Sequence, residues 1–284
     1  MKKQFPIHLL LVFILTKGII ALDAGPAQTR DETAPAGATW PRPPEIRKDF
    51  DFNQGWRFYV LDQAPSNIRR LTEAVDVAKM DDAAWERVTL PHTVRLEPIN
   101  ASGGQNYQGV CWYRKHFTLG NDGKDRKIYL LFEGAMATAD VWLNGVHLAS
   151  HYCGYLPFTV DLSKQARFDG ENIVAVKLDN SDNPEVPPGK PQSSLDFTYF
   201  GGLYRGVHLQ VFNPLHVTDH ILDNNPAGGG VFVTYPEVSA AAATVRIQTD
   251  VTNEWETPRN CKVAQTLTAP DGTVAAAAEA TLRL

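Results

Sequence analysis

Cysteine is scarce in this sequence, and its spacing matches no familiar metal-binding or disulfide pattern. The 284 residues contain three cysteines, Cys111, Cys153 and Cys261, which lie far apart along the chain. Zinc sites use closely spaced pairs of ligands, and small domains held by disulfides use a larger, even set of cysteines. We therefore expect buried free thiols, no metal site and no cofactor, with a Cys111–Cys153 disulfide as the alternative in an oxidising compartment.

The sequence also lacks a marked excess of charge of either sign. It has 27 lysine and arginine residues against 32 aspartate and glutamate residues, which gives a formal net charge of -5. Proteins that bind nucleic acid concentrate basic side chains on one face, because contacts to phosphates need cations. No long run of lysine or arginine occurs here, so we exclude nucleic acid as a partner.

Long apolar runs are missing as well. The stretch from Leu9 to Leu15 is too short to span a bilayer, so we expect no membrane segment. Lys2 and Lys3 precede it, and a basic start followed by a short apolar stretch is typical of an export signal. We expect residues 1–24 to be a signal peptide and the protein to be secreted or periplasmic.

The region around this signal leaves one alternative open. Lys17 interrupts the apolar part, which allows a buried N-terminal element instead. Residues 25–46 are rich in alanine, proline and threonine and show no hydrophobic periodicity. Such a segment cannot bury enough apolar surface to fold, so we expect a flexible leader there.

No stretch of the remaining chain repeats its apolar residues with the period of a long helix. Residues 172–178 and 207–212 instead alternate apolar and polar side chains as half-buried strands do. Asn144-Gly145 lies between two strand-like segments and predicts a β-hairpin, because both turn residues must accept a positive φ. Many short strands joined by turns predict an all-β fold, a β-sandwich.

One long segment cannot take part in a sheet. Residues 180–194 are rich in proline, asparagine and serine. Proline cannot donate to a strand ladder, so we expect a long loop here, which we call the excursion. Long loops on rigid sandwiches often carry binding residues. Residues 155–158, by contrast, are expected to fill the core.

After Pro214 the strand-like segments continue, with a different amino-acid composition. Residues 231–233, 243–251 and 262–267 are rich in apolar and β-branched types, and turn signals separate them. They resemble the opening strands of an immunoglobulin-like sandwich, a fold of about 100 residues, of which about 70 are present. We expect residues 214–284 to form a truncated immunoglobulin-like domain in a polypeptide that continues.

Six motifs follow one another within residues 51–213. They are Phe52-Asn53-Gln54-Gly55-Trp56-Arg57-Phe58, Asp82-Ala83-Ala84-Trp85 with Leu90-Pro91-His92, Trp112-Tyr113-Arg114-Lys115-His116-Phe117, Ala139-Asp140-Val141-Trp142-Leu143-Asn144-Gly145, Gly154-Tyr155-Leu156-Pro157-Phe158, and Asp196-Phe197-Thr198-Tyr199-Phe200-Gly201-Gly202-Leu203-Tyr204-Arg205. In this order they resemble the N-terminal sugar-binding domain of glycoside hydrolase family 2. That family contains β-galactosidases, β-glucuronidases and β-mannosidases.

The resemblance implies a protein of three parts. A jelly-roll (galactose-binding-like) β-sandwich would span residues 47–213, an immunoglobulin-like domain would follow, and a (β/α)₈ barrel would hold the chemistry. A barrel takes about 250 residues of alternating strands and helices, a pattern that this sequence lacks. The resemblance therefore implies the N-terminal, non-catalytic part of a β-galactosidase-like exo-glycosidase of carbohydrate metabolism, inactive alone.

The same resemblance sets the expected partners. They are a β-galactoside-like carbohydrate and the catalytic barrel of the parent protein, with association into a homo-oligomer left open. Two alternatives account for the same residues. One is a stand-alone carbohydrate-binding module, and the other is a structural domain that braces a barrel.

Catalytic residues are not expected in this chain. Glycosidases use two opposed carboxylates, and the resemblance implies that the acid directly follows an asparagine on a barrel strand. Asn253-Glu254 is the one such pair in the sequence. It ends a strand-like segment, and no second carboxylate motif accompanies it.

Asp196 is the candidate substrate-binding residue. In β-galactosidases the matching aspartate reaches the active-site pocket, where a carboxylate accepts hydrogen bonds from sugar hydroxyls. The alternatives are a turn cap or an ion pair with Arg205, which we expect to order the loop or dock the barrel. Phe197, Tyr199 and Phe200 are further candidates, because they can stack on sugar faces, although packing at a domain interface is favoured for them.

The histidines that invite a catalytic or metal-binding interpretation are expected to be structural. His92 has no serine or cysteine in a nucleophile motif to activate. His147 and His151 are four residues apart, a spacing that converges on a helix and not across a turn.

Overall fold

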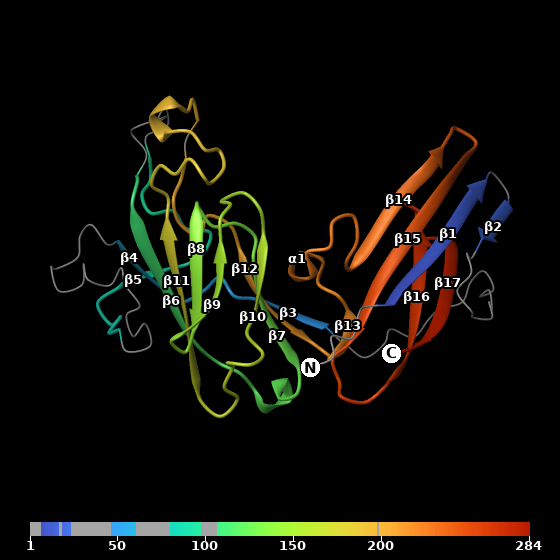
Figure 1. Cartoon of the computed structure of the whole chain (residues 1–284), viewed down its shortest axis with the longest axis horizontal. Helices are drawn as coiled ribbons and strands as arrows, with labels where there is room; N and C mark the ends of the chain where they lie inside the picture. The colour runs from blue at the N-terminus through green and yellow to red at the C-terminus, as the bar shows by residue number, and fades with distance from the viewer. Residues whose placement is uncertain (1–6, 17–18, 24–46, 61–79, 98–106, 198) are drawn as a thin grey trace. The chain divides into compact units, whose positions relative to one another are not determined.

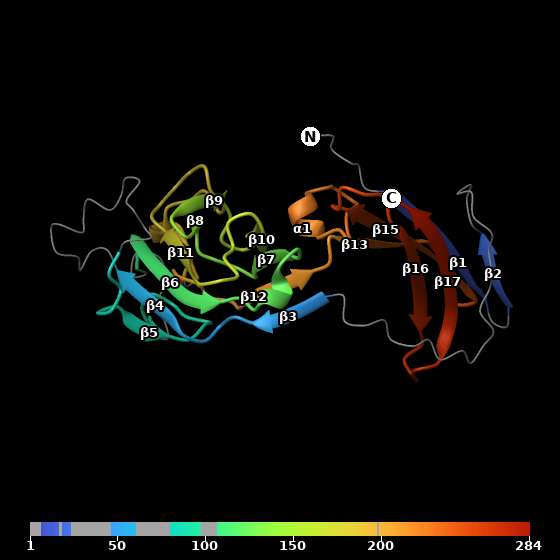
Figure 2. The same ribbon diagram turned by 90° about the horizontal axis from the view of Figure 1, so that it is seen from below.

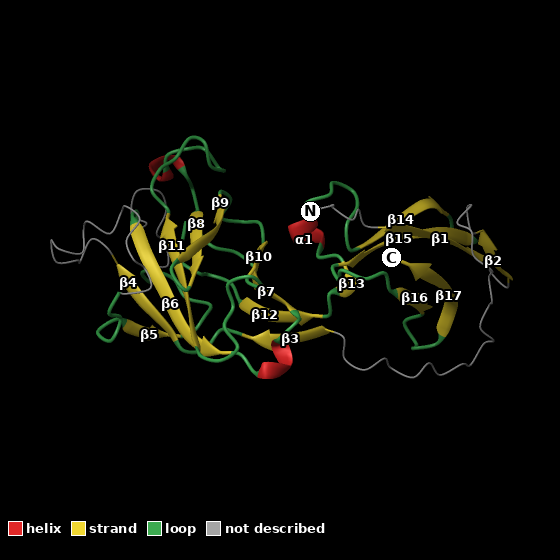
Figure 3. Ribbon diagram, turned by 60° about the horizontal axis from the view of Figure 1, so that its bottom comes forward, coloured by secondary structure: helices red, strands yellow, loops and turns green. Residues whose placement is uncertain are grey.

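Strands dominate the computed structural model, as Figure 3 shows. It describes residues 7–16, 19–23, 47–60, 80–97, 107–197 and 199–284. The expected leader, residues 25–46, lies outside the described residues. The helical elements in the described part of the chain are α1 (His220–Asp223) and two 3-10 turns, Asn121–Gly123 and Gln192–Ser194. The all-β prediction is confirmed.

The chain divides into two compact units, which are described separately. Residues 47–211 form the first unit, and Phe212–Leu284 with the strands before residue 46 form the second. None of the helices in the described ranges is long and apolar enough to cross a membrane.

The first unit contains two sheets of strands (Figure 1). One has six strands in the order β5-β4-β6-β11-β8-β9, and the other has four in the order β10-β7-β12-β3. The strand bounds are β3 Arg47–Asp51, β4 Trp56–Val60, β5 Glu86–Val88, β6 Val110–Thr118, β7 Lys127–Phe132, β8 Thr138–Leu143, β9 Val146–His151, β10 Phe158–Asp161, β11 Glu171–Asp179 and β12 Val207–Phe212.

The hairpin predicted at Asn144-Gly145 is confirmed. It joins β8 and β9, and its two turn residues have φ values of 53° and 86°. Both lie in the left-handed region that asparagine and glycine accept most readily. The turn is also fixed from outside, because Asn144 Oδ1 accepts a hydrogen bond from the backbone N–H of Ile173 at 3.0 Å.

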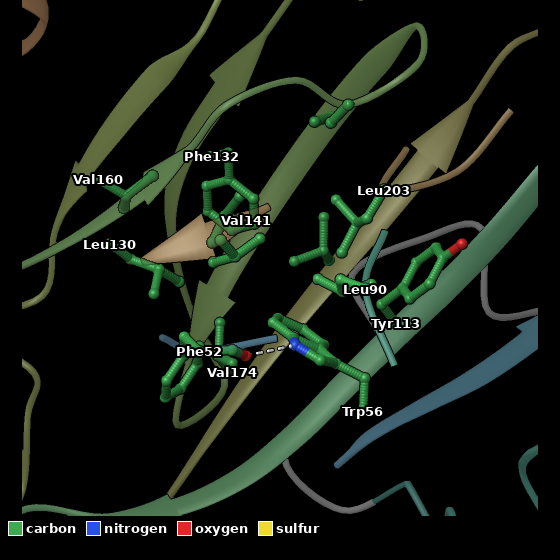
Figure 4. Packing of buried hydrophobic residues seen from close by; sticks show 14 of the residues in the cluster. Phe52, Trp56, Leu90, Tyr113, Leu130, Phe132, Val141, Val160, Val174 and Leu203 are labelled. Carbon is green, nitrogen blue, oxygen red and sulfur yellow. Dashed lines mark hydrogen bonds between the residues drawn. The ribbon is translucent and has the colours of Figure 1, made fainter. Parts of the chain in front are cut away.

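The facing sides of the two sheets enclose one apolar core (Figure 4). Along β8, Ala139, Val141 and Leu143 are buried while the residues between them are half-buried, the period of two that a strand imposes. Figure 4 shows the indole N–H of Trp56 donating to the backbone oxygen of Phe52, at 2.8 Å. Other buried members of the core are Phe58, Tyr113, Leu130, Phe132, Val160, Val174, Leu178 and Leu209 from the two sheets, and Leu203 from the loop before β12.

The other face of the six-stranded sheet carries a smaller aromatic cluster. Trp85, Trp112 and Ala175 are buried there. Arg114, on the same side of β6 as Trp112, is also buried, and its guanidinium lies 3.0 Å from Asp82 Oδ2. A buried ion pair therefore lies within apolar surroundings.

The three cysteines are free thiols. Cys111 belongs to the buried core, and burial raises the pKa of its thiol. Cys153 and Cys261 are half-buried, so the expectation of buried thiols is right for Cys111 and wrong for the other two.

The second unit is built around the long strand β15 (Ala242–Asn253), as Figure 2 helps to trace. β13 (Leu215–Val217) and β14 (Val231–Val238) both pair with it in antiparallel register. β16 (Asn260–Thr268) and β17 (Val274–Arg283) form a separate two-stranded sheet. Assignment of this unit to an immunoglobulin-like fold stays a prediction.

A strand also occupies part of the segment in which the sequence predicts a signal peptide. β1 (Ile7–Thr16) pairs with β15 from Ile7 opposite Val251 to Thr16 opposite Ala242, and β2 (Ile19–Asp23) pairs with β1. Apolar and β-branched residues favour strands as well as signal sequences, which is why the sequence leaves both open. Signal cleavage and export stay predictions.

The inner face of β14 is left uncovered. Val233 lies directly opposite Ile247 of β15, so the two side chains share one face of the sheet. Ile247 is buried against Ala276 and Ala280 of β17, whereas Val233 and Val231 are 39% and 58% exposed. The β16–β17 hairpin thus covers the buried residues of β15, whereas Val231 and Val233 of β14 are exposed in the part of the chain that the structure describes.

Two half-buried histidines, His92 and His151, predict that the protein loses stability in mild acid. Burial lowers the pKa values of His92 and His151 below the ordinary value of 6.5. Between that value and the lower folded-state values, the unfolded chain binds more protons than the folded chain, so stability falls as pH falls. We expect the Tm from circular dichroism to fall between about pH 7 and pH 5.

Matched variants identify which residues cause this dependence of Tm on pH. His92→Gln with His151→Gln should flatten it, whereas His220→Gln, at an exposed position, should leave it unchanged. An equal slope in the double variant and the parent would show that other groups govern the acid response.

Candidate functional site

The loop that holds the predicted site residues, described over residues 195–197 and 199–205, is anchored by backbone hydrogen bonds. The N–H of Val94 donates to the oxygen of Gly201 at 3.2 Å, and the N–H of His92 donates to the oxygen of Leu203 at 2.8 Å. The N–H of Met136 donates to the oxygen of Gly202 at 3.1 Å. The loop is therefore a defined part of the first unit.

Gly202 makes this anchoring sterically feasible. Its φ is +104°, and a Cβ atom there would lie 2.5 Å from the hydroxyl of Tyr113 and 2.9 Å from the oxygen of His92. Any other residue would meet both neighbours, so the position requires the missing side chain of glycine. His92 is half-buried, and its Nδ1 lies 2.8 Å from that same hydroxyl, a contact that fits the structural role predicted for it.

Asp196 is exposed on this loop. Its carboxylate forms no hydrogen bond or ion pair with the part of the chain that the structure describes, so neither a turn cap nor a pair with Arg205 is found there. Arg205 is itself exposed, with its guanidinium 5.6 Å from the ring centre of Tyr204. The acceptor oxygens of Asp196 therefore face solvent, and its contact with substrate stays a prediction.

The three aromatic candidates divide into two kinds. Phe197 and Phe200 are 44% and 38% exposed, so their rings are available for stacking or docking. Tyr199 is only 5% exposed and packs with Met136 and Val186. Burial raises the pKa of its hydroxyl.

A second loop, residues 152–156, lies beside the first. The ring of Tyr155 meets Tyr199 edge-on at 6.4 Å between centroids, and the hydroxyl of Tyr204 donates to the oxygen of Gly154 at 2.7 Å. The expectation that residues 155–158 fill the core is wrong for Tyr155, Leu156 and Pro157, which are exposed, and right for Phe158.

The two loops together present exposed apolar side chains, which we call the aromatic patch. Sequence patterns alone did not identify its members from the second loop, because Tyr155 and Leu156 follow no strand or helix period. The patch consists of Tyr152, Tyr155, Leu156, Phe197 and Phe200.

A pocket lies beneath the excursion, next to the first loop. Its volume is about 90 Å³, and Asp196 is not among its lining residues. The excursion leaves the end of β11, as Figure 1 shows, and returns past Gln192 towards Tyr199. The pocket is lined by Ala137, Thr138, Asp179, Ser181, Asp182, Asn183, Val186, Pro188, Lys190, Gln192 and Tyr199.

Within the described ranges, no group of three or more histidine, cysteine, aspartate or glutamate side chains is placed to hold a metal ion. His147 and His151, for example, have separate surroundings. His147 Nε2 lies 3.2 Å from Asp140 Oδ1, whereas the ring of His151 stacks on Phe158 at 4.3 Å.

The Asn253-Glu254 pair lies at the end of β15, with Asn253 as the last residue of the strand. Asn253 is buried, and its amide donates to the backbone oxygens of Thr257 and Leu284 at 3.1 Å and 3.2 Å. The N–H of Glu254 donates to the oxygen of Pro214 at 2.9 Å. These contacts hold the amide of Asn253 and the backbone of Glu254, and the absence of a catalytic role for the pair stays a prediction.

Comparison with known sequences identifies relatives over most of the chain. Residues 51–213 match the profile of the sugar binding domain of glycosyl hydrolases family 2. A β-glucuronidase of Formosa agariphila is 32% identical over 81% of this chain, and the β-galactosidase BoGH2A of Bacteroides ovatus is 29% identical over 80%. The matched region is 24% of each relative.

Solved structures give the same result. The β-glucuronidase 2 of Bacteroides uniformis, covalently bound to cyclophellitol-6-carboxylate aziridine, superposes with a TM-score of 0.70 at 28% identity, over 84% of this chain and 26% of that one. A putative β-galactosidase from Bacteroides fragilis reaches 0.71 at 27% identity, over 84% of this chain and 33% of that one. The chain thus spans about a quarter to a third of its relatives.

Proposed function

Because the chain belongs to glycoside hydrolase family 2, we propose that it forms the N-terminal, non-catalytic part of a β-galactosidase-like exo-glycosidase. The parent enzyme would remove terminal β-linked sugars, with both catalytic carboxylates on a barrel outside this chain. In this proposal the protein is exported, to the periplasm or the outside of the cell.

The observation that carries the proposal is the exposure of Asp196 on an anchored loop. Its carboxylate is exposed on a loop whose backbone is held at several points, within the domain that the family uses for sugar binding. An anchored loop keeps a carboxylate in place without filling its acceptor sites, which suits the recognition of hydroxyl groups. The exposed rings of Phe197 and Phe200 flank it in sequence and supply apolar surface for a sugar face or a neighbouring domain.

Asp196→Ala in the protein expressed from its full reading frame tests this role. We expect kcat/KM for 4-nitrophenyl β-D-galactoside to fall about ten- to a hundredfold, the loss typical of one charge-assisted hydrogen bond. Asp169→Ala, at another exposed aspartate of the same unit, is the matched control and should retain full activity. Equal activity of the two variants would rule out substrate contact by Asp196.

A stand-alone sugar-binding module is the second candidate, favoured by the polar pocket and the aromatic patch. It predicts that the 284-residue chain binds methyl β-D-galactopyranoside at millimolar or lower Kd in calorimetry and that Asp196→Ala abolishes this binding. Under the first proposal, turnover requires the longer protein.

A further inference from the structure

We propose that His92 is a positioning residue, whose neutral ring holds the hydroxyl of Tyr113 and, through it, the loop that carries Asp196. The loop then loosens when the ring takes up a second proton. The effect of the ring on the loop is a property of this chain, whereas its effect on activity rests on the function proposed above. Three parts of the first unit meet here: the segment that begins at His92, β6, and the loop.

The segment that begins at His92 lies along the loop. The N–H of His92 donates to the oxygen of Leu203 at 2.8 Å, and the N–H of Val94 donates to the oxygen of Gly201 at 3.2 Å. The hydroxyl of Thr93 donates to the same oxygen of Gly201 at 3.1 Å. The side chain of His92 is therefore attached to the backbone that anchors the loop.

Asp196 lies between this anchor and an earlier one. Before it, the N–H of Leu195 donates to the oxygen of Gln192 at 3.0 Å. After it come the backbone hydrogen bonds of residues 201–203. A carboxylate between two fixed points keeps its place, and the loss of one of them widens the range of positions that it samples.

The hydroxyl of Tyr113 determines the protonation state of the ring. Tyr113 is fully buried, and its hydroxyl lies 2.8 Å from His92 Nδ1. Burial raises the pKa of this hydroxyl well above its ordinary value of 10.0, and a hydrogen bond from the backbone of Leu203 opposes the rise. A backbone N–H can only donate, so the oxygen of Tyr113 accepts from Leu203.

The proton of the same hydroxyl also needs a partner. Among the residues that the structure describes, its acceptor is His92 Nδ1. A ring nitrogen accepts only when it carries no proton, so the ring is neutral and its proton lies on Nε2. The hydrogen bonds then run in one direction, from Leu203 to Tyr113 to His92.

The loop lies directly on this hydroxyl. A Cβ atom at Gly202 would lie 2.5 Å from the hydroxyl of Tyr113 and 2.9 Å from the backbone oxygen of His92. There is no space between loop and hydroxyl for either to shift alone, because close-packed interiors transmit small displacements. A change at the hydroxyl is therefore felt by the loop.

A second proton on the ring disrupts this arrangement. Nδ1 becomes a donor that faces the hydroxyl, and the proton of Tyr113 loses its acceptor. An unpaired donor at a fully buried position costs free energy, and opening of the loop to water relieves that cost. The neutral ring thus favours the closed loop, and the charged ring favours the open one.

The groups that face the ring place this change in mild acid. β4 contributes the uncharged ring of Phe58, 4.6 Å away between centroids, and β6 contributes Tyr113. Burial lowers the pKa of His92 below its ordinary value of 6.5, although the exposed carboxylate of Glu86 on β5 raises it. The link is complete above the lowered folded-state pKa and is lost as the pH falls through it.

Hydrogen exchange, followed by nuclear magnetic resonance in the 284-residue chain, tests the link. The reporters are the N–H groups of His92, Val94 and Met136, which donate to oxygens of the loop. We expect their protection factors to fall about three- to tenfold between about pH 7.5 and pH 4.5, the effect of one lost hydrogen bond. The N–H of Leu162, which donates to the oxygen of Ile128 in the same unit, is the control and should keep its protection.

Two substitutions of similar size at position 92 differ in the acceptor. His92→Asn supplies an oxygen that does not titrate near the place of Nδ1, and should keep the parent's protection at neutral pH but lose its pH dependence. His92→Leu has no acceptor and should show low protection across the whole pH range. Tyr113→Phe should match His92→Leu, and Tyr129→Phe, at another buried tyrosine of the same unit, should behave as the parent.

Two results would overturn the proposal. One is a pH dependence in His92→Asn as strong as that of the parent, and the other is parental protection in both His92→Leu and Tyr113→Phe. Neither depends on whether Asp196 contacts substrate.

Activity tests the consequence for the site. In the protein expressed from its full reading frame, kcat/KM of His92→Asn relative to the parent should rise about three- to tenfold as the pH falls through the same range. A constant ratio, with the loop exchange changed as expected, would count against the role of Asp196 and would still support the link between ring and loop.

Discussion

Trp56→Ala should lower the free energy of unfolding of the first unit by about 3–5 kcal/mol, the range for deleting a large buried aromatic side chain. The indole is fully buried, and its ring meets those of Phe52 and Tyr113 edge-on at 5.9 Å and 6.4 Å. Its N–H also donates to the oxygen of Phe52 (Figure 4). The substitution therefore leaves a cavity and removes one of the two donors to that oxygen, the other being Lys115 Nζ at 2.7 Å.

Differential scanning calorimetry checks this expectation, because the chain has two units. Trp56→Phe keeps an aromatic ring and should cost less than Trp56→Ala. Trp255→Ala, at a half-buried tryptophan of the second unit, is the control and should leave the transition of the first unit in place. A Trp56→Ala protein with the parent Tm would mean that this core has relaxed to fill the space.

Arg114→Met should cost about 3–4 kcal/mol, since it leaves Asp82 as a poorly compensated charge in an apolar setting. The side chains of Arg114 and Asp82 are 1% and 12% exposed, and Arg114 also donates to the oxygen of Met80 at 2.5 Å. His116 Nε2, 2.9 Å from the same carboxylate, limits the loss because it can donate in its place.

A double-mutant cycle isolates the ion pair. Arg114→Met with Asp82→Leu replaces both charges by apolar groups and should recover part of the lost stability in urea unfolding. Lys127→Met, which breaks the more exposed pair with Asp161 at 3.0 Å, should cost no more than about 1 kcal/mol. Additive losses in the Arg114 and Asp82 variants would contradict a coupled pair.

The features that the sequence predicted correctly depend on short-range chemistry. The Asn144-Gly145 turn needs only two residues that accept a positive φ, and β12 needs only its alternation of apolar and polar residues. The excursion follows from the prolines that cannot enter a ladder. None of these depends on which distant segment packs against the element.

The candidate site was predictable only in part, because it also depends on contacts between segments that are distant in sequence. Asp196, Phe197 and Phe200 are exposed on a loop, as a binding role requires, but the burial of Tyr199 depends on Met136 and Val186, which no local pattern connects to it. The sequence did not predict the burial of Gln192, because this residue is held by hydrogen bonds to Asn180 and Asp182 at the other end of the excursion. Polar residues in a proline-rich loop suggest solvent exposure, and only the tertiary structure shows one of them buried.

Because β1 pairs with β15, the proposed removal of the signal peptide would also affect the self-association of the processed chain. Cleavage after residue 24 would remove the 10-residue strand that lies along one edge of β15, and with it the ladder of hydrogen bonds to that edge. The N–H and C=O groups of β15 would then be open to another strand, in the same unit as the uncovered apolar face of β14. An open edge of this kind recruits strands from other molecules, so processing of the N-terminus would act on self-association and solubility as well as on location.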